Sequence, residues 1–502
     1  MQNCTKKLPI LEEIKSFNPK LSNININTDI NADKNADKNA DKNADKNRTS
    51  SSSLGNREIG CHYENVRKKY DRKQIAQYAL TVGNTSDNLL HKRHQKNTLS
   101  KTEFKLKSKK DNAIKKINQT LCSCGRDFHY MNEEKIVDIK ETKTTRRVKG
   151  LKSCGNNAAC PVCAAKLSTI RGNQLSELME AGRKNNRGYI MAITTIPHQP
   201  AEGLSTPLNQ VIDMSRYIFQ HKKFRNFKKL TKCRFVHGGL ENMVSFKNGL
   251  IDWHPHKNYI LDFDIPIKEV IAVLGLNNEA ELSMYISELM TSLGQKYLDS
   301  KNIDKKLLKP YYSSGVNGRI IVKGGVSATV DFQDSYIAKW GLEAEMTASI
   351  YKDGRIDGSM HPFGLLDLIS DKNKETTKEQ KQQCIKAFQE FVYESKGKWW
   401  FYFAKGSIAY YNEQYGTELK VRKDEEELEL LEDNGDLIYS LSEEEWKFFE
   451  PSPRKLGFAL SLPTRKEVIE FIYDEIEKNR IKIAERYFNH RISTYLRQRK
   501  KE

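Results

Sequence analysis

The sequence predicts an α+β fold, and two observations carry this prediction. Segment 188–196 (GYIMAITTI) is apolar, rich in β-branched residues and stops before Pro197, and two further strand-like segments, 235–246 and 250–263, meet near Asn248-Gly249, a hairpin turn signal. Helical patterns occur before, between and after these strands, at 167–183, 205–227, 279–298 and 377–393. The assignments are compatible with an antiparallel sheet flanked by helices, although they do not specify one by themselves.

The N-terminal part of the chain has a different composition. Residues 31–47 repeat NADK and lead into a serine run, so nothing there can bury a core. Residues 56–120 are polar and Lys-rich, with room for short helices and for electrostatic contact with DNA. We therefore expect a largely disordered basic leader at 1–120. A Cys-rich lobe would follow at 121–166, the main domain at 167–415, and a helical C-terminal region with a basic tail at 416–502.

The charge balance narrows the choice of partner. The 502 residues include 84 Lys and Arg against 65 Asp and Glu, a formal net charge of +19, which favours a polyanion such as nucleic acid. The last 25 residues hold nine Lys or Arg and two Glu, whereas 424–432 is an acidic run expected to be solvated. No apolar run is long enough for a transmembrane helix and the N-terminus lacks an apolar signal core, so we expect a cytoplasmic protein.

Five of the nine cysteines fall in one short stretch, namely Cys122, Cys124, Cys154, Cys160 and Cys163. In a reducing compartment, clustered cysteines more often bind metal than form disulfides. The C-P-V-C pair is typical of tetrahedral zinc, which needs four ligands, and His129 is a further candidate ligand. The pattern predicts a structural zinc without choosing the four ligands; buried free thiols are the alternative.

A second group of metal-ligand types lies in the segment IDWHPHKNYILDF, residues 251–263. Side chains alternate along a strand, so His254, His256 and Asn258 project from one face, while Trp253 faces the other way. Two imidazoles and an amide oxygen on one face can hold a divalent cation. Histidine pairs are more often structural than ligating, so the spacing alone leaves this open.

At this point the sequence resembles a known family. WHPHKNYIL is similar to the metal motif W-H-P-H-x-H of HUH endonucleases, the rolling-circle replication initiators of bacterial plasmids. Four more segments resemble the family's motifs in the family's order: AITTIPH at 192–198, YIAKWGLEAEMT at 336–347, PFGLL at 362–366, and FAKG at 403–406, where relatives usually show W-S-R-G. Many relatives also carry C-P-x-C ahead of these motifs. The resemblance spans roughly Cys122 to Tyr415.

The resemblance implies an HUH domain with an antiparallel central sheet, the metal motif on a central strand, and Mg²⁺ or Mn²⁺ as the catalytic cation. It places His256 and position 258 at the metal, and position 258 here is Asn, a weaker and uncharged ligand. Either His254 compensates or the site binds metal weakly, and loss of nicking is the alternative. Glu241 is the expected third ligand, because relatives often show L-E-V-T there, with Asp252 as the runner-up.

The resemblance also implies a reaction. Tyr336 would attack a phosphate of single-stranded origin DNA, form a 5′-phosphotyrosine link and free a 3′-OH, while Lys339, one helical turn on, neutralises phosphate charge. Host helicase and polymerase would be partners. Relatives with one tyrosine need another group for the terminating cleavage: a nearby acid (Asp331, Asp334, Glu343 or Glu345) or a second protomer's tyrosine. Competing expectations are a transposase or relaxase of the same superfamily, and a non-catalytic DNA-binding protein.

Overall fold

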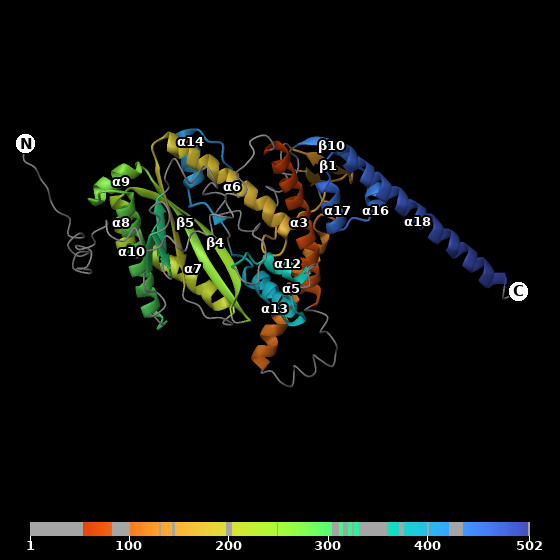
Figure 1. Cartoon of the computed structure of the whole chain (residues 1–502), viewed down its shortest axis with the longest axis horizontal. Coiled ribbons are helices and arrows are strands. Elements are labelled where there is room, and N and C mark those ends of the chain that lie inside the picture. The colour runs from red at the N-terminus through yellow and green to blue at the C-terminus, as the bar shows by residue number, and fades with distance from the viewer. Residues whose placement is uncertain are drawn as a thin grey trace, which may run out of the picture. The chain divides into compact units, whose positions relative to one another are not determined.

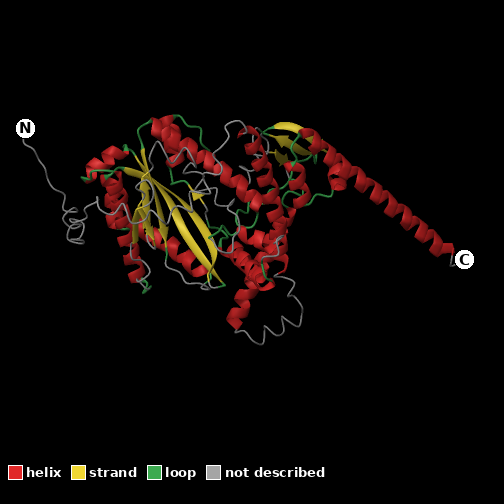
Figure 2. Ribbon diagram, viewed as in Figure 1, coloured by secondary structure: helices red, strands yellow, loops and turns green. Residues whose placement is uncertain are grey.

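The computed structural model describes residues 54–82, 101–129, 132–142, 146–196, 203–247, 249–303, 311–314, 320–323, 326–330, 359–370, 376–398, 401–420 and 435–499. Within these ranges the chain combines helices with antiparallel sheets, which confirms the predicted α+β class (Figures 1 and 2).

The largest sheet has five strands in the order β8-β3-β5-β4-β9, and every neighbouring pair is antiparallel. Its strands are β3 (Gly188–Thr195), β4 (Cys233–Lys247), β5 (Leu250–Phe263), β8 (Val326–Val330) and the short β9 (Phe401–Tyr402). The long strands β4 and β5 form a hairpin whose turn includes Gly249 at a positive φ of 75°. The strands expected at 188–196, 235–246 and 250–263 are therefore present, and β5 lies at the centre of the sheet.

One face of this sheet is covered by α7 (Ser205–Gln220), α8 (Lys222–Leu230) and α10 (Glu279–Ser300). The ring of Phe219 packs edge-on against Tyr259 at 4.7 Å, and Phe227 packs against Phe263 at 6.3 Å. Burying each such ring contributes about 1.5–3 kcal/mol. Because side chains alternate along β5, the even-numbered residues of that strand, His256 and Asn258 among them, project from the opposite face.

The opposite face is covered at one end by α6 (Pro161–Lys184) and α14 (Ser407–Tyr415). The Tyr411 hydroxyl donates to Asp262 Oδ2 of β5 at 2.9 Å and lies 2.7 Å from the Tyr189 hydroxyl of β3. The helices thus cover the Asp262 end of this face, and residues 252–258 occupy its other end.

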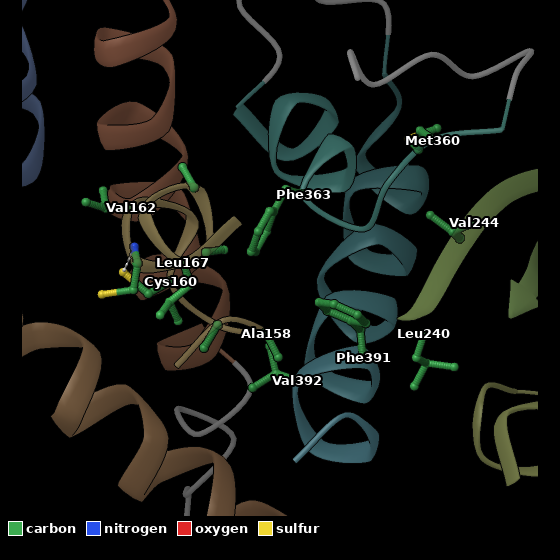
Figure 3. Packing of buried hydrophobic residues seen from close by; sticks show 14 of the residues in the cluster. Ala158, Cys160, Val162, Leu167, Leu240, Val244, Met360, Phe363, Phe391 and Val392 are labelled. Atoms are coloured by element: carbon green, nitrogen blue, oxygen red, sulfur yellow. Dashed lines mark hydrogen bonds between the residues drawn. The ribbon is translucent and has the colours of Figure 1, made fainter. Parts of the chain in front are cut away.

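Two helices join the sheet to the Cys-rich lobe. They are α12 (Gly364–Ser370) and α13 (Lys378–Glu394), the second of which begins at a capping box between Thr377 and Gln380. Figure 3 shows Phe363 and Phe391 between Leu167 on one side and Val244 on the other, all of them members of one hydrophobic cluster. A backbone bridge between Val244 and Met360 attaches the end of the hairpin to this layer.

The N-terminal region is more ordered than its composition predicts. Residues Leu54–Val82 form α3 and Lys101–Ser123 form α5, so the expected disordered leader is wrong for both stretches. Tyr70, Leu80, Ile114 and Leu121 are buried in the main hydrophobic cluster. The prediction failed because α3 also buries Arg72 and Lys73, and these cations interrupt the apolar period by which a packed helix is recognised.

The C-terminal region shares a sheet with the Cys-rich lobe. This sheet has the order β10-β1-β2, with strands Asp436–Leu441, Val137–Glu141 and Arg146–Lys149. Three helices follow β10: α16 (Glu443–Phe449), α17 (Pro453–Ser461) and α18 (Arg465–Arg499). Gly457 of α17 packs so closely on α3 that an added Cβ would lie 2.4 Å from Tyr70 Cβ.

The remaining described elements are α9 (Ile267–Leu274) and a two-stranded sheet of β6 (Tyr311–Ser314) and β7 (Ile320–Lys323). None of the helices in the described ranges combines the length and apolarity that a membrane crossing requires.

Candidate metal centres

Four cysteines of the clustered five meet at one point. Cys124 follows α5, Cys154 lies in the loop after β2, Cys160 caps the N-terminus of α6, and Cys163 lies in the first turn of that helix. Pro161 begins α6, and the Cys160 sulfur accepts a hydrogen bond from the Cys163 N–H at 3.5 Å. The helix start therefore directs the two sulfurs of C-P-V-C to the same side.

The spacing of these sulfurs suits a tetrahedral ion. Cys124 Sγ lies 3.6 Å from Cys163 Sγ and 3.9 Å from Cys160 Sγ, and Cys154 Sγ lies 3.6 Å from Cys163 Sγ. Zinc–sulfur bonds of about 2.3 Å place tetrahedral sulfurs about 3.8 Å apart. All four sulfurs lie within 4.8 Å of one another, so the group can hold a metal ion such as zinc.

Cys122 and His129 lie outside this group. The Cys122 sulfur contacts Asn118 Oδ1 of its own helix at 3.7 Å. A tetrahedral zinc ion takes four ligands, and these four cysteines supply them. Among the described residues the geometry therefore identifies the four ligands that the sequence left open.

A buried lysine accompanies the four cysteines. Lys73 of α3 is 2% exposed and donates a hydrogen bond to the carbonyl of Cys124. Burial by itself lowers the pKa of Lys73, but the charges of Cys124, Cys160 and Cys163 outweigh it and hold that pKa above its usual range. Zinc bound by four thiolates carries a net charge of −2, and Lys73 supplies one opposing charge.

The second centre lies on the β4–β5 hairpin. Glu241 stands directly opposite His256, with Glu241 Oε2 2.8 Å from His256 Nε2. Asn258, two residues on along the same face, donates through Nδ2 to the same carboxylate oxygen at 3.4 Å. Asn258 Oδ1 is buried and makes no hydrogen bond within the described residues. Three of the four predicted ligands, His256, Asn258 and Glu241, therefore come together.

The contacts of His256 limit what can lie between its imidazole and the Glu241 carboxylate. His256 Nδ1 is 3.2 Å from the His254 carbonyl, which orients the ring when Nδ1 carries a proton. In that tautomer Nε2 presents a lone pair, and a lone pair and a carboxylate oxygen 2.8 Å apart repel each other. A proton on Nε2, which would then donate to Glu241, or a metal cation between the two atoms would remove this repulsion.

His254 belongs to a separate group, with Ser245 and Asp252. Its Nε2 lies 2.8 Å from Ser245 Oγ and 3.3 Å from Asp252 Oδ2, both farther along the hairpin from Glu241. Asp252, the runner-up ligand, thus joins His254 and not the His256 group. Because serine and aspartate meet the same ring nitrogen, the three residues do not have the geometry of a nucleophilic triad, which uses both nitrogens.

The predicted nucleophile falls outside the described residues. Tyr336 and Lys339 fall outside the described residues, as do His198 and the acidic candidates for the terminating cleavage, Asp331, Asp334, Glu343 and Glu345. Of the four other motif segments, PFGLL and FAKG are fully described, and AITTIPH is described as far as Ile196. PFGLL begins α12, and in FAKG the Ala404 N–H donates to His237 Nδ1 of β4 at 3.3 Å.

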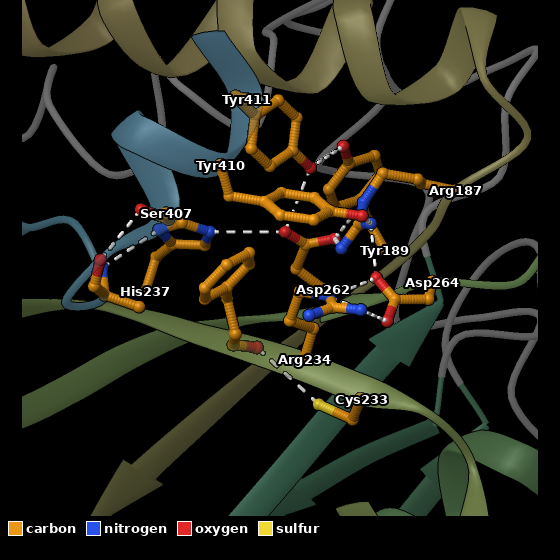
Figure 4. Close-up of polar contacts among 12 residues, drawn as sticks. Arg187, Tyr189, Cys233, Arg234, His237, Asp262, Asp264, Ser407, Tyr410 and Tyr411 are labelled. Atoms are coloured by element: carbon orange, nitrogen blue, oxygen red, sulfur yellow. Dashed lines mark hydrogen bonds and ion pairs between the residues drawn. The ribbon is translucent and has the colours of Figure 1, made fainter. Parts of the chain in front are cut away.

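A polar network that the sequence did not suggest lies at the far end of the same sheet face (Figure 4). The Arg187 guanidinium, 1% exposed in its side chain, donates to Asp262 Oδ1 at 2.7 Å and also pairs with Asp264. Burial lowers the pKa of Arg187 and Asp262 raises it, and the net result is a pKa above the usual range. Burial, and to a smaller extent the charge of Asp262, also raise the pKa of Tyr411. These residues fasten α14 to the Asp262 end of β5.

No protein-family model matches this chain, and neither a curated protein nor a solved structure does. Any function assigned to the chain therefore follows from its own residues and from the motifs they form.

Proposed function

We propose that the chain is a rolling-circle replication initiator of the HUH endonuclease type, which nicks and rejoins one strand of origin DNA. The main observation in support is the group of His256, Glu241 and Asn258, which lies on adjacent strands of an antiparallel sheet. The strand β5, which carries His256 and Asn258, is the central strand of that sheet. The ordered motifs at 192–198, 336–347, 362–366 and 403–406 support the same proposal.

The donor set fits a hard divalent cation such as Mg²⁺ or Mn²⁺. His256 Nε2 and Glu241 Oε2 already converge, and turning the Asn258 amide over would bring its buried Oδ1 to the place now held by Nδ2. A cation there would polarise the scissile phosphate. Asn258 can thus donate to Glu241 in the metal-free state and offer an oxygen in the loaded state.

The chemistry would be a transesterification. The Tyr336 oxygen attacks phosphorus, its proton leaves to solvent or a base, and the bond to the 3′ oxygen breaks, which gives a 5′-phosphotyrosine and a free 3′-OH. The number of phosphodiester bonds is unchanged, so the reverse reaction rejoins the strand without ATP. Lys339 would offset phosphate charge, and host helicase and polymerase would use the opened strand.

A basic surface on α8 supports DNA as the partner. Residues 214–240 contain eight Lys or Arg and no Asp or Glu. Phe224 and Phe227 bury one face of α8, which leaves Lys222, Lys223, Arg225 and Lys229 exposed. Nearby Lys296, Lys223 and Arg225 contribute, after burial, to a lowered pKa of His221, as a positive local potential requires. Such a surface fits the phosphates of a duplex.

The direct experiment mixes full-length protein and Mn²⁺ with supercoiled plasmids that carry the DNA flanking its gene. We expect nicked circles and a protein–DNA adduct that survives detergent. Both should be absent in Tyr336→Phe and present in Tyr473→Phe, which changes a tyrosine that is 56% exposed. Wild-type protein that forms no adduct on any of these plasmids, or an adduct that persists in Tyr336→Phe, contradicts the proposal.

One observation favours a second function. Asn258 stands where the motif has histidine, and a chain that had lost nicking would still bind DNA through α8 and its basic tail. This candidate predicts DNA binding without cleavage. Asn258→His discriminates between the two candidate functions. If the chain only binds DNA, the variant should bind metal more tightly but still not cleave DNA.

A further inference from the structure

The FAKG segment forms a tight turn that leads into α14. The Ser407 N–H donates to the Ala404 carbonyl at 3.0 Å, and the Ser407 hydroxyl donates to the same oxygen at 2.8 Å. Gly406 has a φ of 83° and a ψ of −6°, and Lys405 before it has a negative φ, which together define a type II turn. An added Cβ at Gly406 would meet nothing within 4 Å, so the backbone conformation alone requires glycine there.

Strand pairing places this turn beside the His256 centre. Phe401 of β9 is paired with Gly239 of β4, and Gly239 is paired with Asn258 of β5. Neighbouring strands lie about 4.8 Å apart, so Phe401 lies about 10 Å from Asn258. The turn begins at Ala404, three residues after Phe401. It therefore borders the side of the centre that Asn258 occupies.

His237 of β4 holds the turn in this place. Its side chain is fully buried, and its Nδ1 accepts a hydrogen bond from the Ala404 N–H at 3.3 Å. The Phe403 ring packs edge-on against the imidazole, with the two centroids 5.9 Å apart. Because Nδ1 accepts, the proton of the neutral ring lies on Nε2, which is 3.6 Å from Asp262 Oδ2 (Figure 4). One imidazole thus connects the turn to the buried network at the end of β5.

The turn presents a single cation, Lys405. This lysine is exposed, and no carboxylate pairs with it among the described residues. The backbone around it is fixed, since Ala404 uses both its N–H and its carbonyl within the protein and Ser407 is fully buried. A cation on a fixed backbone loses less conformational freedom when it binds an anion than a cation on a mobile loop does.

We propose that His237 is a positioning residue that holds Lys405 beside the His256 centre, where Lys405 binds a backbone phosphate of the DNA strand. This role rests on the proposed function, in which DNA is the substrate. A strand whose scissile phosphate lies at the metal continues past it, and its next phosphates favour an opposing charge. His237 is buried and acts only through the turn.

Binding of a single-stranded oligonucleotide, taken from the DNA that flanks the gene, tests Lys405. Fluorescence anisotropy without added Mn²⁺ keeps cleavage out of the measurement. Lys405→Gln should reduce the slope of log affinity against log salt by about 0.7, the value for one phosphate contact on a single strand. Lys386→Gln, which removes an exposed lysine from α13, should keep the wild-type slope.

Two glycines give a matched test of the turn itself. Gly406→Ala should weaken strand binding as Lys405→Gln does, because alanine disfavours a φ of 83° and the turn loses its shape. Gly416, at the other end of α14, has a φ of 66° and equally open surroundings, so Gly416→Ala should bind the strand as wild type does. Equal weakening in both variants would show that the turn has no particular part in binding.

Two substitutions of His237 separate its two ring nitrogens. His237→Asn keeps an acceptor near the position of Nδ1 and should bind the strand as wild type does, whereas His237→Gln places its amide near Nε2 and should bind more weakly. In the Lys405→Gln background, His237→Gln should cause no further loss, because its effect passes through Lys405. An equal loss in both backgrounds, or an asparagine variant as weak as the glutamine variant, overturns the positioning role.

The same measurements distinguish this role from the proposed function. Wild-type protein that does not bind the strand contradicts both. Wild-type protein that binds the strand and forms the Tyr336 adduct, while Lys405→Gln keeps the wild-type salt slope, overturns the role of Lys405 and His237 alone.

Discussion

Glu241 and His256 face each other across the β4–β5 hairpin, with 2.8 Å between Oε2 and Nε2, while His254 pairs with Ser245 and Asp252 one step farther along. The sequence placed both histidines on one strand face and could not separate them. The structure separates them because cross-strand register decides which carboxylate each imidazole meets.

This separation gives the first prediction. His256→Ala should weaken Mn²⁺ binding by at least about tenfold, since even outer-shell changes cost metal sites about 10- to 100-fold. His254→Ala should leave the affinity close to that of wild type, because the His254 side chain contacts Ser245 and Asp252 and only its backbone carbonyl meets His256. Titration calorimetry or the Mn²⁺ electron paramagnetic resonance signal measures both. Equal losses in the two variants would show that His254 is a ligand.

Asn258 gives the second prediction. Replacing it with histidine restores the motif and supplies a stronger donor for Mn²⁺, so we expect Asn258→His to bind Mn²⁺ about tenfold more tightly, a gain of about 1.4 kcal/mol. Asn258→Leu, which has a similar volume and no donor, should bind more weakly than wild type. An affinity that is the same in all three proteins would mean that position 258 does not contact the metal.

The four-cysteine centre gives the third prediction. Cys160→Ser should reduce zinc, measured by atomic absorption, from one ion per chain to substoichiometric amounts, and should lower the unfolding midpoint because the buried group loses its central ion. Cys122→Ser is the matched control and should keep both values, since its sulfur contacts Asn118 outside the group. Loss of zinc in Cys122→Ser would instead make that residue a ligand.

The basic face of α8 gives the fourth prediction. Changing Lys222, Lys223, Arg225 and Lys229 to glutamine should reduce the slope of log affinity against log salt for duplex DNA by up to about 3.6, at about 0.9 per phosphate contact. The control changes four lysines that pair with glutamate elsewhere in the chain: Lys135, Lys184, Lys447 and Lys466. Fluorescence anisotropy at several salt concentrations compares the two sets, and similar slopes for both would remove α8 from the interface.

The same features explain how far the sequence could predict the structure. The hairpin strands were recognisable because apolar and β-branched runs flank Asn248-Gly249, and C-P-V-C indicated the metal group. The helix α3 was missed because its buried positions include two cations, whose partners lie on distant segments. Arg72, for example, donates to Asp367 at 2.6 Å, a contact between residues 295 positions apart. No local pattern encodes a pairing of that kind.

The buried network at the end of β5 gives the last prediction. Arg187 and Asp262 are both withdrawn from solvent, and removing one partner leaves the other charge buried. Arg187→Met should therefore lower the free energy of unfolding by about 3–5 kcal/mol, measured by urea denaturation. Adding Asp262→Leu to that variant should recover part of the loss, because the orphaned carboxylate is then gone. Arg234→Met is the control: Arg234 pairs with Asp264 from an exposed position, so its loss should cost about 1 kcal/mol or less. A single variant as stable as wild type would mean that α14 is held to the sheet by its apolar contacts, with Tyr411 and Phe401 among them, and that the ion pair adds nothing to the anchoring of β5.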